Sequence, residues 1–151
     1  MIVENEGIEQ IENIWKNNNK GYICYECNQR SIKDKELLKV IYKENDIVFG
    51  YAVLYFGKDF CELEEYPNKI VNMPDKLAYI WEIVTDKDHL RKGVATSILQ
   101  YIKDKYKGYS IYSCINLSNK PSLNLHSKIG FKTLYEFELT GESKYKMMEL
   151  K

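Results

Sequence analysis

The sequence predicts one α/β domain over residues 1–151, and three observations carry this prediction. Residues 80–99 pass from a strand-like run to apolar residues at helical spacing. Residues 109–131 repeat that order with a second strand and a second helix. The stretches 36–56 and 132–150 each hold two strand-like runs around a turn, which is typical of an antiparallel hairpin. The length of 151 residues fits one domain with a sizeable core.

The composition fits a folded domain and argues against several other classes of protein. Hydrophobic residues make up 44% of the chain, which is neither a disordered nor a membrane composition. The 22 basic and 22 acidic residues balance, whereas a nucleic-acid partner favours a basic excess. The chain has no run of about 18 apolar residues, and no leader pattern follows Met1. We therefore expect no nucleic-acid partner, no membrane span and a cytoplasmic protein.

The amino-terminal region carries a helix and a pair of cysteines. Residues 8–15 have apolar side chains at helical spacing, which predicts a short amphipathic helix. Cys24 and Cys27 form a C-x-x-C pair, but the other two cysteines, Cys61 and Cys114, and both histidines show no paired spacing. We therefore expect reduced thiols and no metal site.

The hairpin at residues 36–56 has Asn45–Asp46 as its turn, and a polar connection follows it. This connection, residues 58–76, carries the acidic residues Glu62, Glu64 and Glu65. It is either a solvated connection or a flap over a substrate, in which case the carboxylates attract a cationic amine.

The stretch at residues 80–99 has the order of a phosphate-binding site: strand, basic glycine loop, helix. In the first turn of the helix, unpaired N–H groups and the positive end of the helix dipole face outward. Gly93 lets a ligand approach the backbone closely, and Arg91 and Lys92 add positive charge. The alternative is an ordinary helix start with solvated basic residues.

The loop motif LRKGVA at Leu90–Ala95 resembles the Q/R-x-x-G-x-G/A signature of the GNAT superfamily of N-acetyltransferases. In that family the loop holds the pyrophosphate of acetyl-coenzyme A (acetyl-CoA). Gly93 and Ala95 match the signature and Leu90 does not. Because backbone amides make most of the contacts with the pyrophosphate in such a loop, we expect weaker coenzyme binding rather than none.

A second stretch, SNKPSLNLHSKIGF at residues 118–131, resembles the family's N-x-x-A/S-x-x-x-Y-x-x-x-G-F segment. The matching residues are Asn119, Ser122, Gly130 and Phe131. His126 stands where the family usually has tyrosine. Two motifs in family order, separated by a strand, are more specific than either motif alone.

The resemblance implies a GNAT fold, with a mixed, mostly antiparallel sheet of about six or seven strands and helices on both faces. It also implies acetyl transfer from acetyl-CoA to a primary amine of a small molecule or peptide, by direct attack on the thioester. The implied coenzyme-binding residues are Ile83, Val84, Thr85, Arg91, Lys92, Gly93, Val94, Ala95, Thr96 and Asn119.

Two residues are candidates for the acid–base steps that the family's chemistry needs. His126 replaces the tyrosine that protonates the leaving thiolate, and its alternative is to cap the helix face or to hydrogen-bond the coenzyme. Glu82 on the central strand is the candidate base, directly or through water, and its alternative is to pair with a basic residue of a neighbouring strand.

A catalytically silent module that binds acyl-CoA or a protein is the second functional hypothesis. The aromatic terminal hairpin also suggests a possible homodimer.

Overall fold

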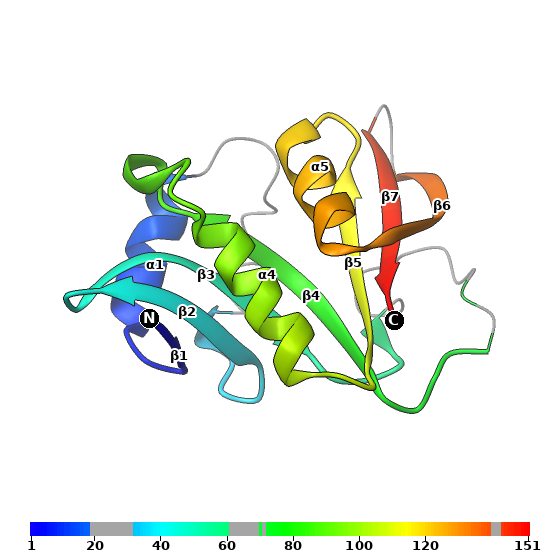
Figure 1. The fold of residues 1–151 in the computed structure, drawn as a ribbon, viewed down its shortest axis with the longest axis horizontal. Helices are drawn as coiled ribbons and strands as arrows, with labels where there is room; N and C mark the ends of the chain where they lie inside the picture. Colours follow the sequence, from blue (N-terminus) through cyan, green and yellow to red (C-terminus); the bar gives the residue numbers. More distant parts are fainter. Residues whose placement is uncertain (19–31, 61–69, 71, 140–142) are drawn as a thin grey trace. The chain divides into compact units, whose positions relative to one another are not determined.

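The structure is a computed structural model, and it describes residues 1–18, 32–60, 70, 72–139 and 143–151. Figure 1 labels the helices and strands of this part of the chain. The strands are β1 (Ile2–Glu4), β2 (Leu38–Glu44), β3 (Ile47–Tyr55), β4 (Leu77–Thr85), β5 (Ser110–Asn116), β6 (Lys132–Leu139) and β7 (Ser143–Leu150). The helices are α1 (Ile8–Asn17), α4 (Val94–Lys105) and α5 (Lys120–Ile129), with a 3-10 helix at Lys87–His89.

The strands form a 7-stranded sheet in the order β1-β2-β3-β4-β5-β7-β6. The pairs β1–β2, β2–β3, β5–β7 and β6–β7 are antiparallel, whereas β4 and β5 pair in parallel. The expected mixed, mostly antiparallel sheet is therefore confirmed. The chain divides into two compact units, residues 1–54 with 81–105 and residues 55–80 with 106–151. The single domain over residues 1–151 stays a prediction.

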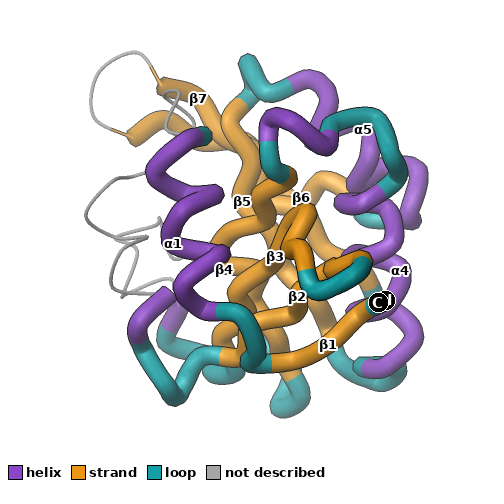
Figure 2. Tube along the Cα trace, turned by 90° about the vertical axis from the view of Figure 1, so that its left-hand side faces the viewer, coloured by secondary structure: helices purple, strands orange, loops and turns teal. Residues whose placement is uncertain are grey.

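In the first unit, α1 and α4 lie on opposite sides of β2 and β3 (Figure 2). The predicted helix α1 buries the apolar residues Ile11, Ile14 and Trp15. Helix α4 buries Val94, Ile98, Leu99 and Ile102. The β2–β3 hairpin turns at Asn45 and Asp46, whose φ angles of 49° and 64° are the left-handed values that a two-residue hairpin turn needs. Both predicted helices and the hairpin turn are confirmed.

Strand β1 is an element that the sequence does not predict. Its residues pair antiparallel with Val40–Tyr42 of β2, at the edge of the sheet. At its end, Glu4 accepts a hydrogen bond from the Tyr101 hydroxyl at 2.9 Å and pairs with Lys105, both on α4. A strand of 3 residues is too short to show an alternating pattern, so contacts from elsewhere in the chain define it.

In the second unit, α5 lies against β5 and β7 (Figure 1) and buries Leu123, His126 and Ile129. It ends at Gly130, whose φ of 118° lets its N–H donate to the carbonyl groups of His126 and Ser127. This predicted helix end is confirmed. Strand β6 is an edge strand of the sheet, and Phe137 on it is buried within the unit. The structure holds one chain, and the homodimer stays a prediction.

Among the described residues, no helix has both the length and the apolar character needed to cross a bilayer.

Candidate functional site

The β4–α4 loop, residues 86–93, leads from the end of β4 directly into the first turn of α4. Arg91 and Gly93 have left-handed backbone conformations, with φ angles of 62° and 73°. No atom of the described chain lies within 4 Å of the position that a Cβ on Gly93 would take, so the space beside Gly93 is open. The first N–H groups of α4 have no partner inside the helix and carry the positive end of its dipole. Together these features form a backbone turn with open space beside it, which can hold an anion.

The side chains around this turn also favour an anion. Arg91, Lys92 and Thr96 are exposed, whereas Val94 is buried and anchors the start of α4. The first turn of α4 contains no acidic residue. Leu90, which departs from the family signature, is 57% exposed and belongs to no part of the core. The structure therefore brings the predicted residues Arg91–Thr96 together around one open, positively polarised turn.

The end of β4 carries the other predicted residues of this unit. Glu82 and Val84 are buried, whereas Ile83 and Thr85 on the opposite face are partly exposed. The side chain of Asn18, at the end of α1, donates to the Thr85 carbonyl oxygen and accepts from the Lys87 N–H at 3.3 Å. The end of α1 therefore holds β4 at the point where the β4–α4 loop begins.

Glu82 lies beside Tyr51 of β3, and only 9% of Glu82 is exposed. Burial raises the pKa of the Tyr51 hydroxyl, and the Glu82 carboxylate raises it further, because ionisation would place two negative charges together. Tyr51 therefore keeps its proton at neutral pH. The predicted carboxylate thus lies beside a protonated hydroxyl of the neighbouring strand β3.

Gly50 is a supporting residue that is not predicted from the sequence. A Cβ at this position would lie 2.7 Å from Val94 Cγ1 and 2.8 Å from the Val84 carbonyl oxygen. Only glycine lets β3 approach the end of β4 and the start of α4 this closely. A glycine inside the strand-like run at residues 47–56 is the signal that could have indicated a close backbone approach.

His126 is completely buried in the second unit, and both of its ring nitrogens have partners. Nδ1 donates to the Ser122 carbonyl oxygen at 2.8 Å, because a carbonyl group can only accept. Nε2 therefore accepts from the Ser113 hydroxyl, at 3.1 Å. Burial lowers the pKa of His126 to about 4, although the Ser122 hydrogen bond opposes this shift. The ring is neutral at physiological pH and holds α5 on β5, which favours the non-catalytic alternative.

Asn119 is the amino-terminal cap of α5. Its side-chain oxygen accepts from the Ser122 N–H at 3.4 Å, and its carbonyl oxygen accepts from the Leu123 N–H at 3.1 Å. A residue predicted to bind the coenzyme therefore has a structural function that explains its identity. The predicted site residues fall into two groups: Asn119 and His126 in the second unit, and all the others in the first.

Several predictions concern parts of the chain that the structure does not describe. The Cys24–Cys27 pair, Cys61 and the acidic residues Glu62, Glu64 and Glu65 lie outside the described residues. In the described ranges, no three His, Cys, Asp or Glu side chains are grouped so as to hold a metal ion.

The open turn at the start of α4 has the features of a site for a phosphate-bearing ligand at a helix amino terminus. A family model described as Acetyltransferase (GNAT) family matches residues 6–131. The chain therefore belongs to the GNAT family of acetyltransferases, and by class the protein is an N-acetyltransferase.

Two relatives agree with this assignment. An N-alpha-acetyltransferase from Sulfurisphaera tokodaii is 26% identical over 123 residues, covering 77% of this chain and 71% of the relative. One from Saccharolobus solfataricus is 26% identical over 111 residues, covering 69% of this chain and 63% of the relative.

Two solved structures show the same fold over nearly the whole chain. The ribosomal-protein-S18-alanine N-acetyltransferase of Escherichia coli has a TM-score of 0.73 at 15% identity, covering 99% of this chain and 93% of that one. Arabidopsis thaliana NAA60 in complex with acetyl-CoA has a TM-score of 0.70 at 13% identity, covering 99% of both chains.

Proposed function

We propose that the protein transfers the acetyl group of acetyl-CoA to the α-amino group of a peptide or protein. The observation that carries this proposal is the open turn of the β4–α4 loop, with Gly93 exposed and no acidic residue in the first turn of α4. A pyrophosphate group is an anion of the kind that such a turn binds. The names of both relatives, N-alpha-acetyltransferase, support an α-amino acceptor.

The residues that would hold the coenzyme are those that surround the open turn. The backbone N–H groups from Gly93 to Thr96 bind the pyrophosphate, and the exposed side chains of Arg91 and Lys92 add positive charge. The backbone of Ile83–Thr85 is the proposed partner of the pantetheine arm. When bound, acetyl-CoA supplies an activated thioester from which an amine can accept the acetyl group.

Glu82 is the proposed base, directly or through a water molecule. An amine must be neutral to attack a carbonyl carbon, so a group has to take up its proton. Glu82 lies on β4 directly before Ile83–Thr85, the proposed partners of the pantetheine arm, and this position supports the function of a base. An α-amino group has a pKa near 8, against about 10.4 for a lysine side chain, so a weak base is sufficient for the proposed acceptor.

The proposal that His126 protonates the leaving thiolate has weaker support. A neutral ring whose Nδ1–H is committed to Ser122 has no proton to give at physiological pH. A structural function, in which His126 positions α5 on β5, agrees with both hydrogen bonds. A solvent proton or the proton removed from the amine can then neutralise the thiolate.

The test is a calorimetric titration with acetyl-CoA, followed by a thiol-release assay on a panel of peptides. Each peptide is offered with a free and with a chemically blocked amino terminus, and lysine-containing peptides with a blocked terminus report on side-chain acetylation. We expect binding, and thiol release only with free α-amino groups. Glu82→Gln is expected to lower kcat by about a hundredfold and to leave acetyl-CoA binding unchanged. No binding of acetyl-CoA to the unaltered protein would overturn the proposal.

A catalytically silent acyl-CoA-binding module is the second candidate. It is favoured by Leu90, which places an exposed apolar side chain where the family signature has arginine or glutamine. The same experiment separates the two, because a silent module binds acetyl-CoA but releases no thiol with any peptide.

A further inference from the structure

The β4–α4 loop is fixed to β3 through contacts that the family signature does not include. The Asp86 N–H donates to the Phe49 carbonyl oxygen at 2.8 Å, which extends the contact of the loop with β3. The Asp86 carboxylate then lies 3.1 Å from His89 Nδ1, and the His89 N–H donates to the Asp86 carbonyl oxygen at 2.9 Å. Backbone and side chain together therefore close a tight turn from Asp86 to His89.

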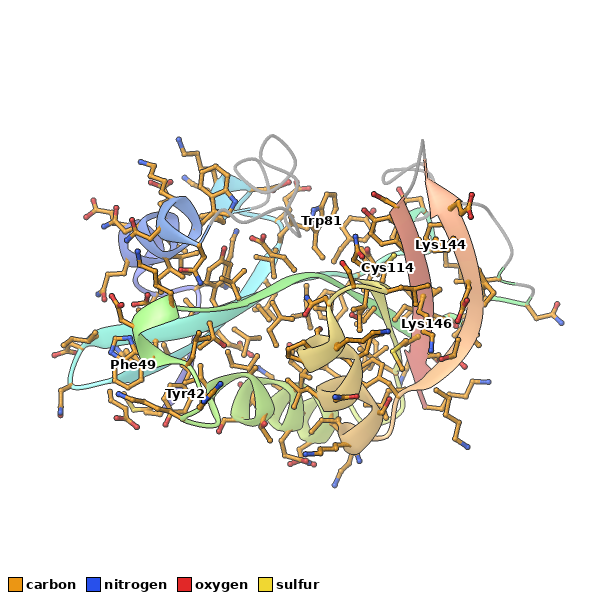
Figure 3. The ribbon with its side chains drawn as sticks, turned by 90° about the horizontal axis from the view of Figure 1, so that it is seen from above. Tyr42, Phe49, Trp81, Cys114, Lys144 and Lys146 are labelled. Carbon is orange, nitrogen blue, oxygen red and sulfur yellow. The ribbon has the colours of Figure 1, made fainter. Side chains whose placement is uncertain are left out.

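The same turn places the His89 ring on Phe49. The two rings are stacked, with centroids 3.8 Å apart and planes inclined by 16°. Tyr42 on β2 lies next to Phe49 (Figure 3), and the centroids of the two rings are 6.0 Å apart. The Lys92 ammonium lies 5.4 Å from the centroid of the Phe49 ring, within the range of a cation–π contact. Phe49 therefore contacts the loop on both sides of Leu90 and Arg91.

Arg91 has a conformation that needs such support. Its φ of 62° is unfavourable for a residue with a Cβ, and such conformations persist only where the surroundings determine them. Arg91 and Leu90 are both exposed, so their own side chains bury too little surface to fix the backbone. The anchored neighbours, His89 before them and Lys92 after them, supply the constraint through Phe49.

We infer that Phe49 and His89 are positioning residues that hold Arg91–Gly93 in the conformation that receives the coenzyme. The inference rests on the proposed function. Neither residue needs to touch the coenzyme, because each acts on the backbone of the loop. Preorganisation of this kind lowers the entropic cost of ordering the loop on binding. Loss of the stack should therefore weaken coenzyme binding without affecting the amine acceptor.

The test is a titration of folded variants with coenzyme A, combined with amide hydrogen exchange of the loop in the free protein. Phe49→Ala and His89→Ala should each weaken coenzyme A binding by about five- to tenfold. Their double variant should be little weaker than either, because both lose the same contact. The amides of Arg91–Gly93 should exchange faster in both variants, and KM for acetyl-CoA should rise while kcat stays unchanged.

Matched variants separate the two contacts of His89 and control for packing. His89→Phe keeps a ring on Phe49 and loses the contact with Asp86, whereas His89→Gln keeps a polar contact and loses the ring. We expect His89→Phe to restore most of the binding and His89→Gln to behave like His89→Ala. Tyr42→Ala removes an aromatic neighbour of Phe49 that lies on β2, outside the loop, and it should leave binding unchanged.

The outcomes for the inference and for the proposed function are distinct. If the unaltered protein binds coenzyme A and Phe49→Ala binds equally well, the positioning inference is wrong and the proposed function stands. Unchanged exchange of Arg91–Gly93 in the variants would overturn the inference by itself. If the unaltered protein binds no coenzyme A, the proposed function is wrong and the inference fails with it.

Discussion

Helices α4 and α5 each follow one of the two parallel strands, yet their amino termini are built differently. Helix α4 begins directly after Gly93, which has no side chain with which to cap the helix. Helix α5 begins after Asn119, whose side chain accepts from the Ser122 N–H, and has Pro121 in its first turn. At the start of α5, the Asn119 side chain takes up an N–H group of the helix itself. At the start of α4 no side chain does so at Gly93, which leaves the N–H groups available for a ligand.

The surroundings of the two helices differ in the same way. Behind α4 stand exposed cations, Arg91 and Lys92, beside an open space. Within α5 the buried His126 has a partner for each ring nitrogen. Two helix starts matched by family motifs can therefore serve separate purposes, one for binding and one for structure. This difference is the basis of the predictions below.

The largest expected effect is that of Gly93→Glu. The new carboxylate would fill the open space with bulk and negative charge, so coenzyme A binding should fall by at least about a hundredfold. Gly108→Glu is the matched control, because Gly108 has a φ of 90° and equally open surroundings in the described chain. It has comparable backbone strain and should leave binding unchanged. Equal affinity of both variants and the unaltered protein in calorimetry would remove the site assignment.

The second prediction concerns stability as a function of pH. Because burial lowers the pKa of His126 from 6.5 to about 4, the folded protein binds fewer protons than the unfolded chain between these values. Stability should therefore fall as the pH drops from 6.5 towards 4, by about 3 kcal/mol in all. Urea unfolding measured across this range should show a smaller slope for His126→Gln.

The same His126→Gln variant separates a structural from a catalytic function. If His126 only holds α5 on β5, kcat of the folded variant should stay within about threefold of the unaltered protein. A fall of about a hundredfold, with loss of one limb of the pH–rate profile, would instead support the catalytic acid.

A smaller effect is expected for Asn119→Ala. Loss of the cap should cost about 1 kcal/mol of unfolding free energy and leave the affinity for coenzyme A within about twofold. Asn124→Ala, at an exposed position of the same helix, is the control and should change neither. A tenfold loss of affinity without loss of stability would show that Asn119 contacts the ligand.

The smallest effect is a gain. Leu90→Arg restores the residue type of the family signature at an exposed position, and it should tighten coenzyme A binding by about three- to tenfold. The gain should shrink at high salt, because it is electrostatic. Leu134→Arg, which replaces another exposed leucine, should have no effect on binding. Unchanged affinity in Leu90→Arg would mean that an arginine side chain at position 90 adds no contact with the coenzyme.

The sequence by itself determined the elements that depend on local spacing. The Asn45–Asp46 turn, the apolar faces of α1 and α4, the end of α5 at Gly130 and the glycine loop before α4 are all encoded within short stretches of chain. The burial of His126 also had a local signal, because Leu123, His126 and Ile129 recur at helical spacing and share the buried face.

Only the tertiary structure decided the contacts between distant stretches. It paired β4 with β5 in parallel, inserted β7 between β5 and β6, and placed Tyr51 beside Glu82. It also stacked His89 on Phe49 and brought Gly50 against Val94. Local propensity and periodicity carry no information about which distant residue fills a given space. That choice depends on packing density and on partners for buried polar groups, and both arise only when the whole chain has folded.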